Sequence, residues 1–275
     1  MSLTLEDLSV LGRGLRQLHF DVVASHPERR RLLRGTESTK ADVDLEVAFG
    51  RLVHRHLGSD VLIIGEEAIS ANKIPTGHGP LVVLVDPIDG TRLYHANDRG
   101  YACTFAIAYE GRLLGGCVYL PDQDDCYLIM RSGGVYRNGL PISARRQDGL
   151  PLVAVRSNDI VGSPSIRQAY EAANLRVERL GSAARRLMET ALGSITGVVK
   201  TVGVTNGTAR LWGVAAGFLA CEAMGLGFWL DETRRLVAVG ELVIVTALRE
   251  QSDLDFRRKN LDALWNDLWS SAGTR

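Results

Sequence analysis

The spacing of apolar residues along the chain changes its period several times, and each change predicts a new element. From Leu8 to Val22, leucine and valine recur every three or four residues, which is the repeat of an amphipathic helix with one buried face. A second helix is expected over residues 42–57. Short, wholly apolar runs follow at 61–64 and 81–85, and such runs are typical of strands that are buried on both faces.

The middle of the chain has the pattern of an antiparallel meander. Apolar runs at 102–109, 113–120 and 126–130 are separated by turn residues such as Glu110-Gly111. Asn138-Gly139 adds a type I′ hairpin, because this pair favours the left-handed backbone of that turn.

A polar break at 145–149 predicts a boundary near residue 147. We therefore expect an N-terminal α+β half over 1–147, which carries the chemical motifs, and a C-terminal α/β half over 148–275. In the second half, Ser163-Pro164 has the pattern of a helix start. The remaining expected elements are strands at 152–155, 228–230 and 242–245, and helices at 183–192, 208–224 and 252–269.

One apolar window has about the length of a membrane-spanning helix. Residues 211–230 carry a single charge, Glu222. The window also contains four glycines, and a carboxylate inside a membrane is costly. A buried helix followed by a turn and a strand is the better interpretation, so no membrane partner is expected.

Composition and charge exclude several other classes. The 32 basic and 32 acidic residues cancel, so no basic excess is available for nucleic acid. The four cysteines form no Cys-x-x-Cys pair, which is typical of free thiols in a reducing compartment. The first residues lack the basic and apolar profile of a signal peptide. We therefore expect a cytoplasmic protein.

Acidic side chains directly follow both buried strands of the first half. Gly65-Glu66-Glu67 comes after the first strand, and Asp86-Pro87-Ile88-Asp89-Gly90-Thr91 after the second. Two adjacent strands would bring Glu66, Asp86 and Asp89 to one edge of a sheet, where like charges are costly unless a hard cation neutralises them. Pro87 is expected to hold a turn that lets Asp86 and Asp89 face one point. Each motif alone is common in ordinary turns, but together they predict a metal site.

With these motifs the sequence resembles the inositol monophosphatase family, a superfamily of magnesium-dependent, lithium-sensitive phosphatases. The pair Gly-Glu-Glu and Asp-Pro-Ile-Asp-Gly-Thr is specific to that superfamily, and the likeness extends over nearly the whole chain. Further segments that resemble the family lie at 39–46, 134–139, 181–184 and 212–223.

The resemblance implies an α/β fold built as a layered αβαβα sandwich, a homodimer, and hydrolysis of a small phosphorylated alcohol, sugar or nucleotide. It implies that Glu66, Asp86 and the Ile88 carbonyl bind a first Mg²⁺, with Mn²⁺ as an alternative ion, and that Asp86 and Asp89 share a second. Asp42 and Thr91, together with Glu66, would be the catalytic residues, because the first two orient and deprotonate the attacking water. The implied substrate contacts are the Gly90 and Thr91 amides for the phosphate, and Ser182, Ala183 and Asn206 for the alcohol.

One position departs from the family pattern. The residue after Trp212 is Gly213, whereas the family has an aspartate that binds the second metal. We therefore expect this second ion to bind weakly or not at all. An alternative follows from the same residue: a degenerate family member that binds a phosphorylated ligand, or that catalyses a redirected, non-hydrolytic reaction on it.

Overall fold

The structure is a computed structural model of the whole chain. It describes residues 3–33, 38–71, 79–143, 152–155, 176–179, 181–201, 204–205, 208–230, 235–239 and 257–270. The boundary expected near 147, the helix expected after Ser163-Pro164 and the strand expected at 242–245 all lie outside these residues.

Two long helices begin the chain, as predicted. Helix α1 (Leu5–Leu18) continues into a π-helical segment, η1 (His19–Ala24), and a short 3₁₀ helix, η2 (Pro27–Arg30), precedes α2 (Lys40–Leu57). Both α1 and α2 start with a Thr-x-x-Asp capping box, in which each residue of the pair satisfies a backbone N–H of the other.

The first half forms a seven-stranded sheet in which the strand order follows the sequence. Strands β1 and β2 are parallel and every later pair is antiparallel. This arrangement confirms the meander, and the positive φ of Asn138 (51°) and Gly139 (85°) fits the expected hairpin turn. The strands are β1 (Leu62–Gly65), β2 (Leu81–Asp89), β3 (Ala102–Tyr109), β4 (Arg112–Leu120), β5 (Asp125–Met130), β6 (Gly134–Arg137) and β7 (Leu140–Ile142).

The second half contributes a six-stranded sheet in the order β15-β13-β14-β10-β8-β9. Its strands are β8 (Leu152–Val155), β9 (Arg176–Arg179), β10 (Gly197–Thr201), β13 (Gly227–Leu230), β14 (Arg235–Val239) and β15 (Arg257–Lys259). The helices of this half are α7 (Ala183–Ala191), α8 (Ala215–Ala223) and α10 (Leu261–Ser270), and β11 (Val204–Thr205) pairs with β12 (Thr208–Ala209).

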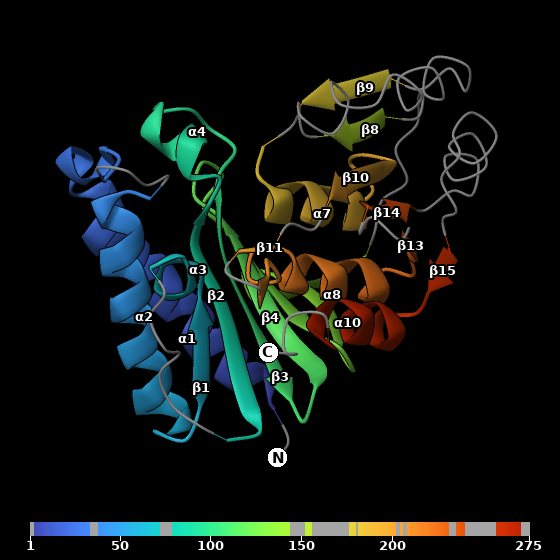
Figure 1. Cartoon of the computed structure of the whole chain (residues 1–275), viewed down its shortest axis with the longest axis horizontal. Coiled ribbons are helices and arrows are strands. Elements are labelled where there is room, and N and C mark those ends of the chain that lie inside the picture. The colour runs from blue at the N-terminus through green and yellow to red at the C-terminus, as the bar shows by residue number, and fades with distance from the viewer. Residues whose placement is uncertain are drawn as a thin grey trace.

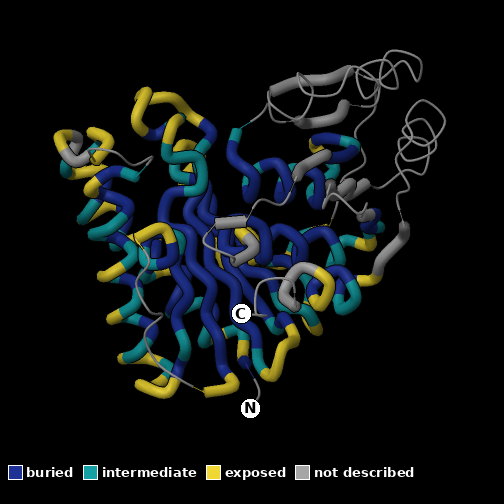
Figure 2. The backbone as a smooth tube through the Cα atoms, in the orientation of Figure 1, coloured by how far each residue is buried: buried dark blue, intermediate teal, exposed yellow. Residues whose placement is uncertain are grey.

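The elements stack in layers (Figure 1). Helices α1 and α2 cover one face of the seven-stranded sheet, α7 and α8 cover the other, and the six-stranded sheet follows. Two hydrophobic clusters fill the space on the two sides of the first sheet. Its strands β2 and β3 are almost continuously buried (Figure 2). The predicted layered α/β fold is confirmed, with helix, sheet, helix and sheet visible in the described residues.

Two helix starts were predicted wrongly. The helix expected from Thr208 begins only at Ala215, because Thr208 and Ala209 pair as a strand. The helix expected from Ser252 begins at Leu261, because Arg257–Lys259 pairs with β13. In both cases strand pairing overrides the local spacing of apolar positions: β12 pairs with β11 just before it, and β15 pairs with the more distant β13.

The apolar window at 211–230 contains helix α8, which is buried from Ala215 to Cys221, a turn and strand β13, as predicted. No helix among the described residues is both long and apolar enough to cross a membrane. The four cysteines are free and buried, as the absence of Cys-x-x-Cys pairs indicates.

Candidate active site

A β-bulge at the end of β2 turns Asp86 and Asp89 toward one point. Asp86 pairs with Thr104 of β3 and Asp89 pairs with Ala102, so three steps along β2 match two along β3. In a regular strand, residues three positions apart point to opposite faces, and the extra residue of the bulge corrects this. Pro87 therefore lies in a bulged strand, and the turn that we expected at this residue is absent.

Gly213 lies against both of these carboxyl groups. A Cβ atom placed on Gly213 would be 2.6 Å from Asp86 Oδ2 and 3.4 Å from Asp89 Oδ1. The glycine that departs from the family pattern is therefore next to the two aspartates of the predicted metal site.

Glu66 reaches the same point from β1. The parallel register places Gly65 opposite Val85, so the next residues along the two strands, Glu66 and Asp86, are neighbours. Their carboxyl groups are in hydrogen-bond contact. The structure thus brings together the three carboxylates that the sequence places at the ends of two buried strands.

Burial and mutual repulsion disfavour ionisation of Asp86 and Glu66. The pKa of Asp86 lies well above its usual value because the side chain is buried and because Glu66 and Asp89 are close. Burial also raises the pKa of Glu66, against which the hydrogen bond from Asp86 and the charge of Arg210 act. A divalent cation would reverse this preference, since it favours the charged form of each carboxylate.

The oxygen atoms of this cluster fit a hard divalent cation such as Mg²⁺, although the side chains are not arranged around an ion. In the described part of the chain, no group of three Asp, Glu, His or Cys side chains is arranged so that it could hold a metal ion. Asp89 Oδ2 instead accepts the backbone N–H of Ala184, at 2.5 Å. Asp89 therefore also connects the cluster to the first turn of α7.

Asp42 and Thr91 form a second polar unit beside the acids. Thr91 Oγ1 donates to Asp42 Oδ1 at 3.0 Å and contacts the Ile88 carbonyl at 3.1 Å. The other oxygen of Asp42 accepts the Thr39 backbone N–H, at 2.8 Å, and the Thr39 hydroxyl. Burial raises the pKa of Asp42, and the hydrogen bonds from Thr39 and Thr91 oppose this rise.

The turn at Gly90 lies close to the start of α7. Gly90 has a φ of 97° and precedes the short helix α4 (Thr91–His95), and a Cβ atom there would be 3.0 Å from Ser182 Cβ. The Ser182 N–H donates to the Gly100 carbonyl at 2.7 Å. Ser182 therefore lies beside Gly90, and Ala183 follows it as the first residue of α7, while Asn206 is outside the described residues.

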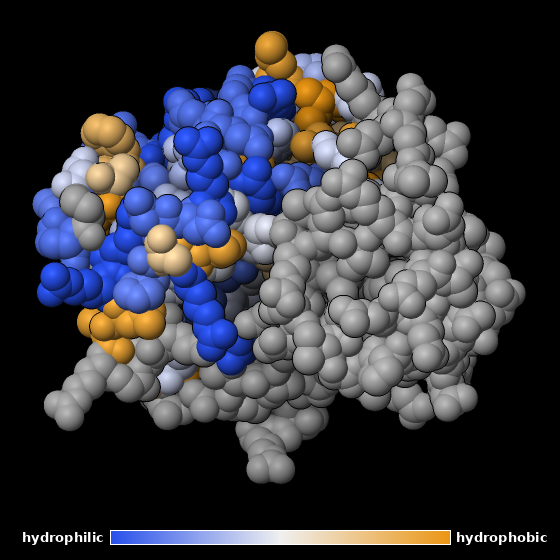
Figure 3. Space-filling model, turned by 90° about the horizontal axis from the view of Figure 1, so that it is seen from above, coloured by the Kyte–Doolittle hydropathy of each residue, from blue (hydrophilic) through white to orange (hydrophobic). Residues whose placement is uncertain are grey.

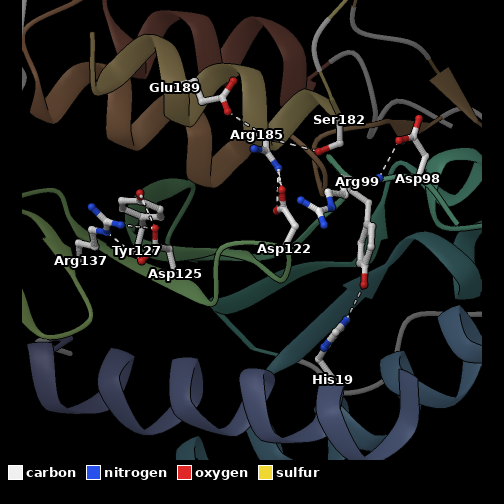
Figure 4. A network of polar contacts seen from close by, with 11 residues as sticks. His19, Asp98, Arg99, Asp122, Asp125, Tyr127, Arg137, Ser182, Arg185 and Glu189 are labelled. Atoms are coloured by element: carbon white, nitrogen blue, oxygen red, sulfur yellow. Dashed lines mark hydrogen bonds and ion pairs between the residues drawn. The ribbon is translucent and has the colours of Figure 1, made fainter. Parts of the chain in front are cut away.

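A partly buried ion-pair network links α7 to the end of β4 (Figure 4). Arg185 Nη1 donates to both carboxylate oxygens of Asp122, at 2.7 and 2.8 Å, and Arg185 Nε donates to Glu189 at 2.8 Å. Asp122 follows β4, so the network joins the two halves of the chain.

Seen from above, the described part of the face that carries α4 and η2 is largely hydrophilic (Figure 3).

Sequence reasoning missed two features of the site. Nothing in the sequence pairs Arg185 with Asp122, which are 63 positions apart. Glu46 belongs to a segment that resembles the family, but its contact with the helix that follows β1 was not predicted. Its position one helical turn after Asp42 was the available signal, since such residues share a helix face.

Comparisons with known proteins agree with the fold and with the family resemblance of the sequence. A sequence model of the inositol monophosphatase family matches residues 33–265. An inositol-1-monophosphatase of Mesorhizobium japonicum is 27% identical over 200 residues, which are 66% of this chain and 68% of that protein. A histidinol-phosphatase of Chlorobaculum parvum is 30% identical over 107 residues, 39% of each chain. The crystal structure of the extragenic suppressor protein suhB of Bartonella henselae shares the fold, with a TM-score of 0.72 and 21% identity over 89% of this chain and 97% of that one.

Proposed function

Because the chain belongs to the inositol monophosphatase family, we propose that it is a metal-dependent phosphatase that hydrolyses the phosphate monoester of a small alcohol, sugar or nucleotide. The observation that carries the proposal is the convergence of Glu66, Asp86 and Asp89 beside the hydrogen-bonded pair of Thr91 and Asp42.

Glu66, Asp86, Asp89 and the Ile88 carbonyl are the proposed ligands, and Mg²⁺ is the proposed ion. A bound divalent ion would supply positive charge for the phosphate oxygens and lower the pKa of water. The position of Gly213 supports a second ion that binds weakly or not at all, because no carboxylate arises from this residue beside Asp86 and Asp89.

Thr91 and Asp42 are the proposed path for the proton of the attacking water. The Thr91 hydroxyl can take this proton as it passes its own to Asp42 Oδ1, which is 3.0 Å away. The raised pKa of Asp42 favours this step, because a carboxylate with a higher pKa holds the proton more firmly. The hydrogen bonds from Thr39 leave only one Asp42 oxygen facing Thr91.

The substrate is proposed to bind between the turn at Gly90 and the start of α7. The amides of Gly90 and Thr91 would bind the phosphate, and Ser182, Ala183 and Asn206 would contact the alcohol. The close approach of Gly90 to Ser182 supports this arrangement for the described residues. The family resemblance further supports a homodimer, and the four free thiols support a reducing, cytoplasmic compartment.

The test is phosphate release from a panel of inositol, sugar and nucleotide monophosphates. We expect release that requires Mg²⁺, stops with a chelator, and falls about 10²- to 10⁴-fold in Thr91→Ala, the usual contribution of proton transfer by a positioned group. Full activity in Thr91→Ala would contradict the role of Thr91, and an absence of release from the whole panel would contradict the proposed substrate class.

A further inference from the structure

Glu46 binds the first turn of the short helix α3 (Glu66–Ser70). Its two carboxylate oxygens accept the backbone N–H groups of Glu67, at 2.8 Å, and Ala68, at 2.9 Å. The first N–H groups of a helix have no acceptor within the helix, and they attract negative charge. Glu46, a residue of α2, therefore provides hydrogen-bond acceptors for backbone N–H groups in the first turn of α3.

Gly65 makes this contact possible. A Cβ atom on Gly65 would lie 2.1 Å from Cδ of Glu46, and 2.3 and 2.5 Å from its two oxygens. The backbone of Gly65 is extended, with a φ of −104°, so the conformation does not require glycine. The space taken by the Glu46 carboxylate does require it, because any larger residue would displace that group.

The backbone on both sides of Glu66 is held in place. Gly65 is fixed by the pairing of β1 with β2, and Glu67 and Ala68 are fixed by Glu46. We propose that Glu46 is a positioning residue for the metal site, which holds α3 so that the Glu66 carboxyl group stays beside Asp86. The proposal rests on the proposed function, since it assigns Glu46 a part in binding the divalent ion.

The first test compares Glu46→Gln with Asp44→Asn in the full chain. Asp44 lies on the same helix and pairs with the exposed Lys40 at 2.9 Å, so this control removes a carboxylate from an ion pair within α2. We expect calorimetric titration with Mg²⁺ to show affinity about 10- to 100-fold weaker in Glu46→Gln, as for other groups that orient metal ligands, and nearly unchanged in Asp44→Asn. Hydrogen exchange at the Glu67 and Ala68 amides should quicken only in Glu46→Gln.

The second test separates the contact from the charge of Glu46. Gly65→Ala keeps every charge but should displace the Glu46 carboxylate and weaken Mg²⁺ binding by a similar factor. In a Glu46→Ala background, Gly65→Ala should change the Mg²⁺ affinity little, because the carboxylate that it would crowd is gone. The losses of affinity caused by the two substitutions should therefore not add. Additive effects would contradict a shared contact.

The outcomes separate the positioning role from the function on which it rests. Wild-type protein that binds no Mg²⁺ would overturn the proposed function, and the role of Glu46 with it. Wild-type binding with unchanged affinity in Glu46→Gln would overturn the positioning role alone.

Discussion

The two capping boxes of the chain offer a matched pair of substitutions, Thr39→Val and Thr4→Val. Thr39 is fully buried and Thr4 is exposed, yet their contacts are alike. The Thr4 backbone N–H and hydroxyl reach Asp7 Oδ2 at 3.0 and 2.6 Å, and the same groups of Thr39 contact Asp42 Oδ2. Valine has nearly the shape of threonine, so each substitution removes one hydroxyl from a helix start.

The two variants should lose stability by different amounts. Removal of an N-cap hydroxyl costs about 1 kcal/mol, and this is the expected loss for Thr4→Val. Both substitutions also remove a hydrogen bond to the carboxyl group of the capping box, but that of Asp42 is buried and has no water to replace the bond, so the loss in Thr39→Val should be about 2–3 kcal/mol. Urea denaturation of both variants measures the difference.

Only Thr39→Val should change the rate of phosphate release. The hydroxyl of Thr39 lowers the pKa of Asp42, so its loss raises this pKa further. Asp42 must be ionised to accept a proton from Thr91, so the acid limb of the profile of kcat against pH should move to higher pH. We also expect kcat at its optimum to fall about tenfold, part of the 10²- to 10⁴-fold that proton transfer contributes, because Asp42 loses one of the bonds that orient it. Identical profiles for the two variants would refute the assignment of Asp42 as the proton acceptor.

Three further predictions follow from single contacts. Burial lowers the pKa of His19 from 6.5 to about 4, so the unfolded chain binds the proton first as the pH falls, and up to about 3 kcal/mol of stability should be lost between pH 6.5 and 4. In urea denaturation the stability of His19→Gln should depend less on pH than that of the wild type, and an equal pH dependence would contradict this prediction. Asp122→Asn, which takes a bidentate partner from the largely buried Arg185, should cost about 1–3 kcal/mol in the same assay, more than a surface charge removal, and a loss below about 0.5 kcal/mol would argue against the role of this network. Gly213→Ala should weaken Mg²⁺ binding by crowding Asp86, whereas Gly213→Asp should bind about 10- to 100-fold more tightly than Gly213→Ala; equal affinities in calorimetry would mean that the returned carboxylate does not reach the ion.

Local patterns predicted the elements whose neighbours are close in sequence. The meander from β3 to β7 joins strands through short turns, so apolar runs and the Asn138-Gly139 pair were sufficient. Strands β12 and β15 were mistaken for helix for different reasons. Strand β12 is only two residues long and pairs with β11 just before it, whereas β15 pairs with the distant β13. Short segments such as Arg257–Lys259 carry no apolar alternation that would reveal a strand.

The site was predictable where strand ends define it. Glu66 and Asp86 are neighbours because they directly follow Gly65 and Val85, which are paired in the parallel strands β1 and β2. The two buried apolar runs in the sequence already implied this arrangement. The bulge that turns Asp89 to the same side, and the bond from Ala184 to Asp89, depend on packing that no local pattern records. The same holds for the contact of Glu46 with α3, which joins residues 21 and 22 positions apart.

The most direct test of the metal centre is calorimetric titration of the wild-type chain and of Asp86→Asn with Mg²⁺. Asp86 is buried between Glu66 and Asp89, and asparagine keeps its shape while removing its charge. We expect saturable binding in the wild type and its loss in Asp86→Asn. The Tm of the metal-free variant should be unchanged or raised, because asparagine replaces a buried acid that is crowded by Glu66 and Asp89. Equal Mg²⁺ affinity in the two proteins would contradict a metal site at the ends of β1 and β2.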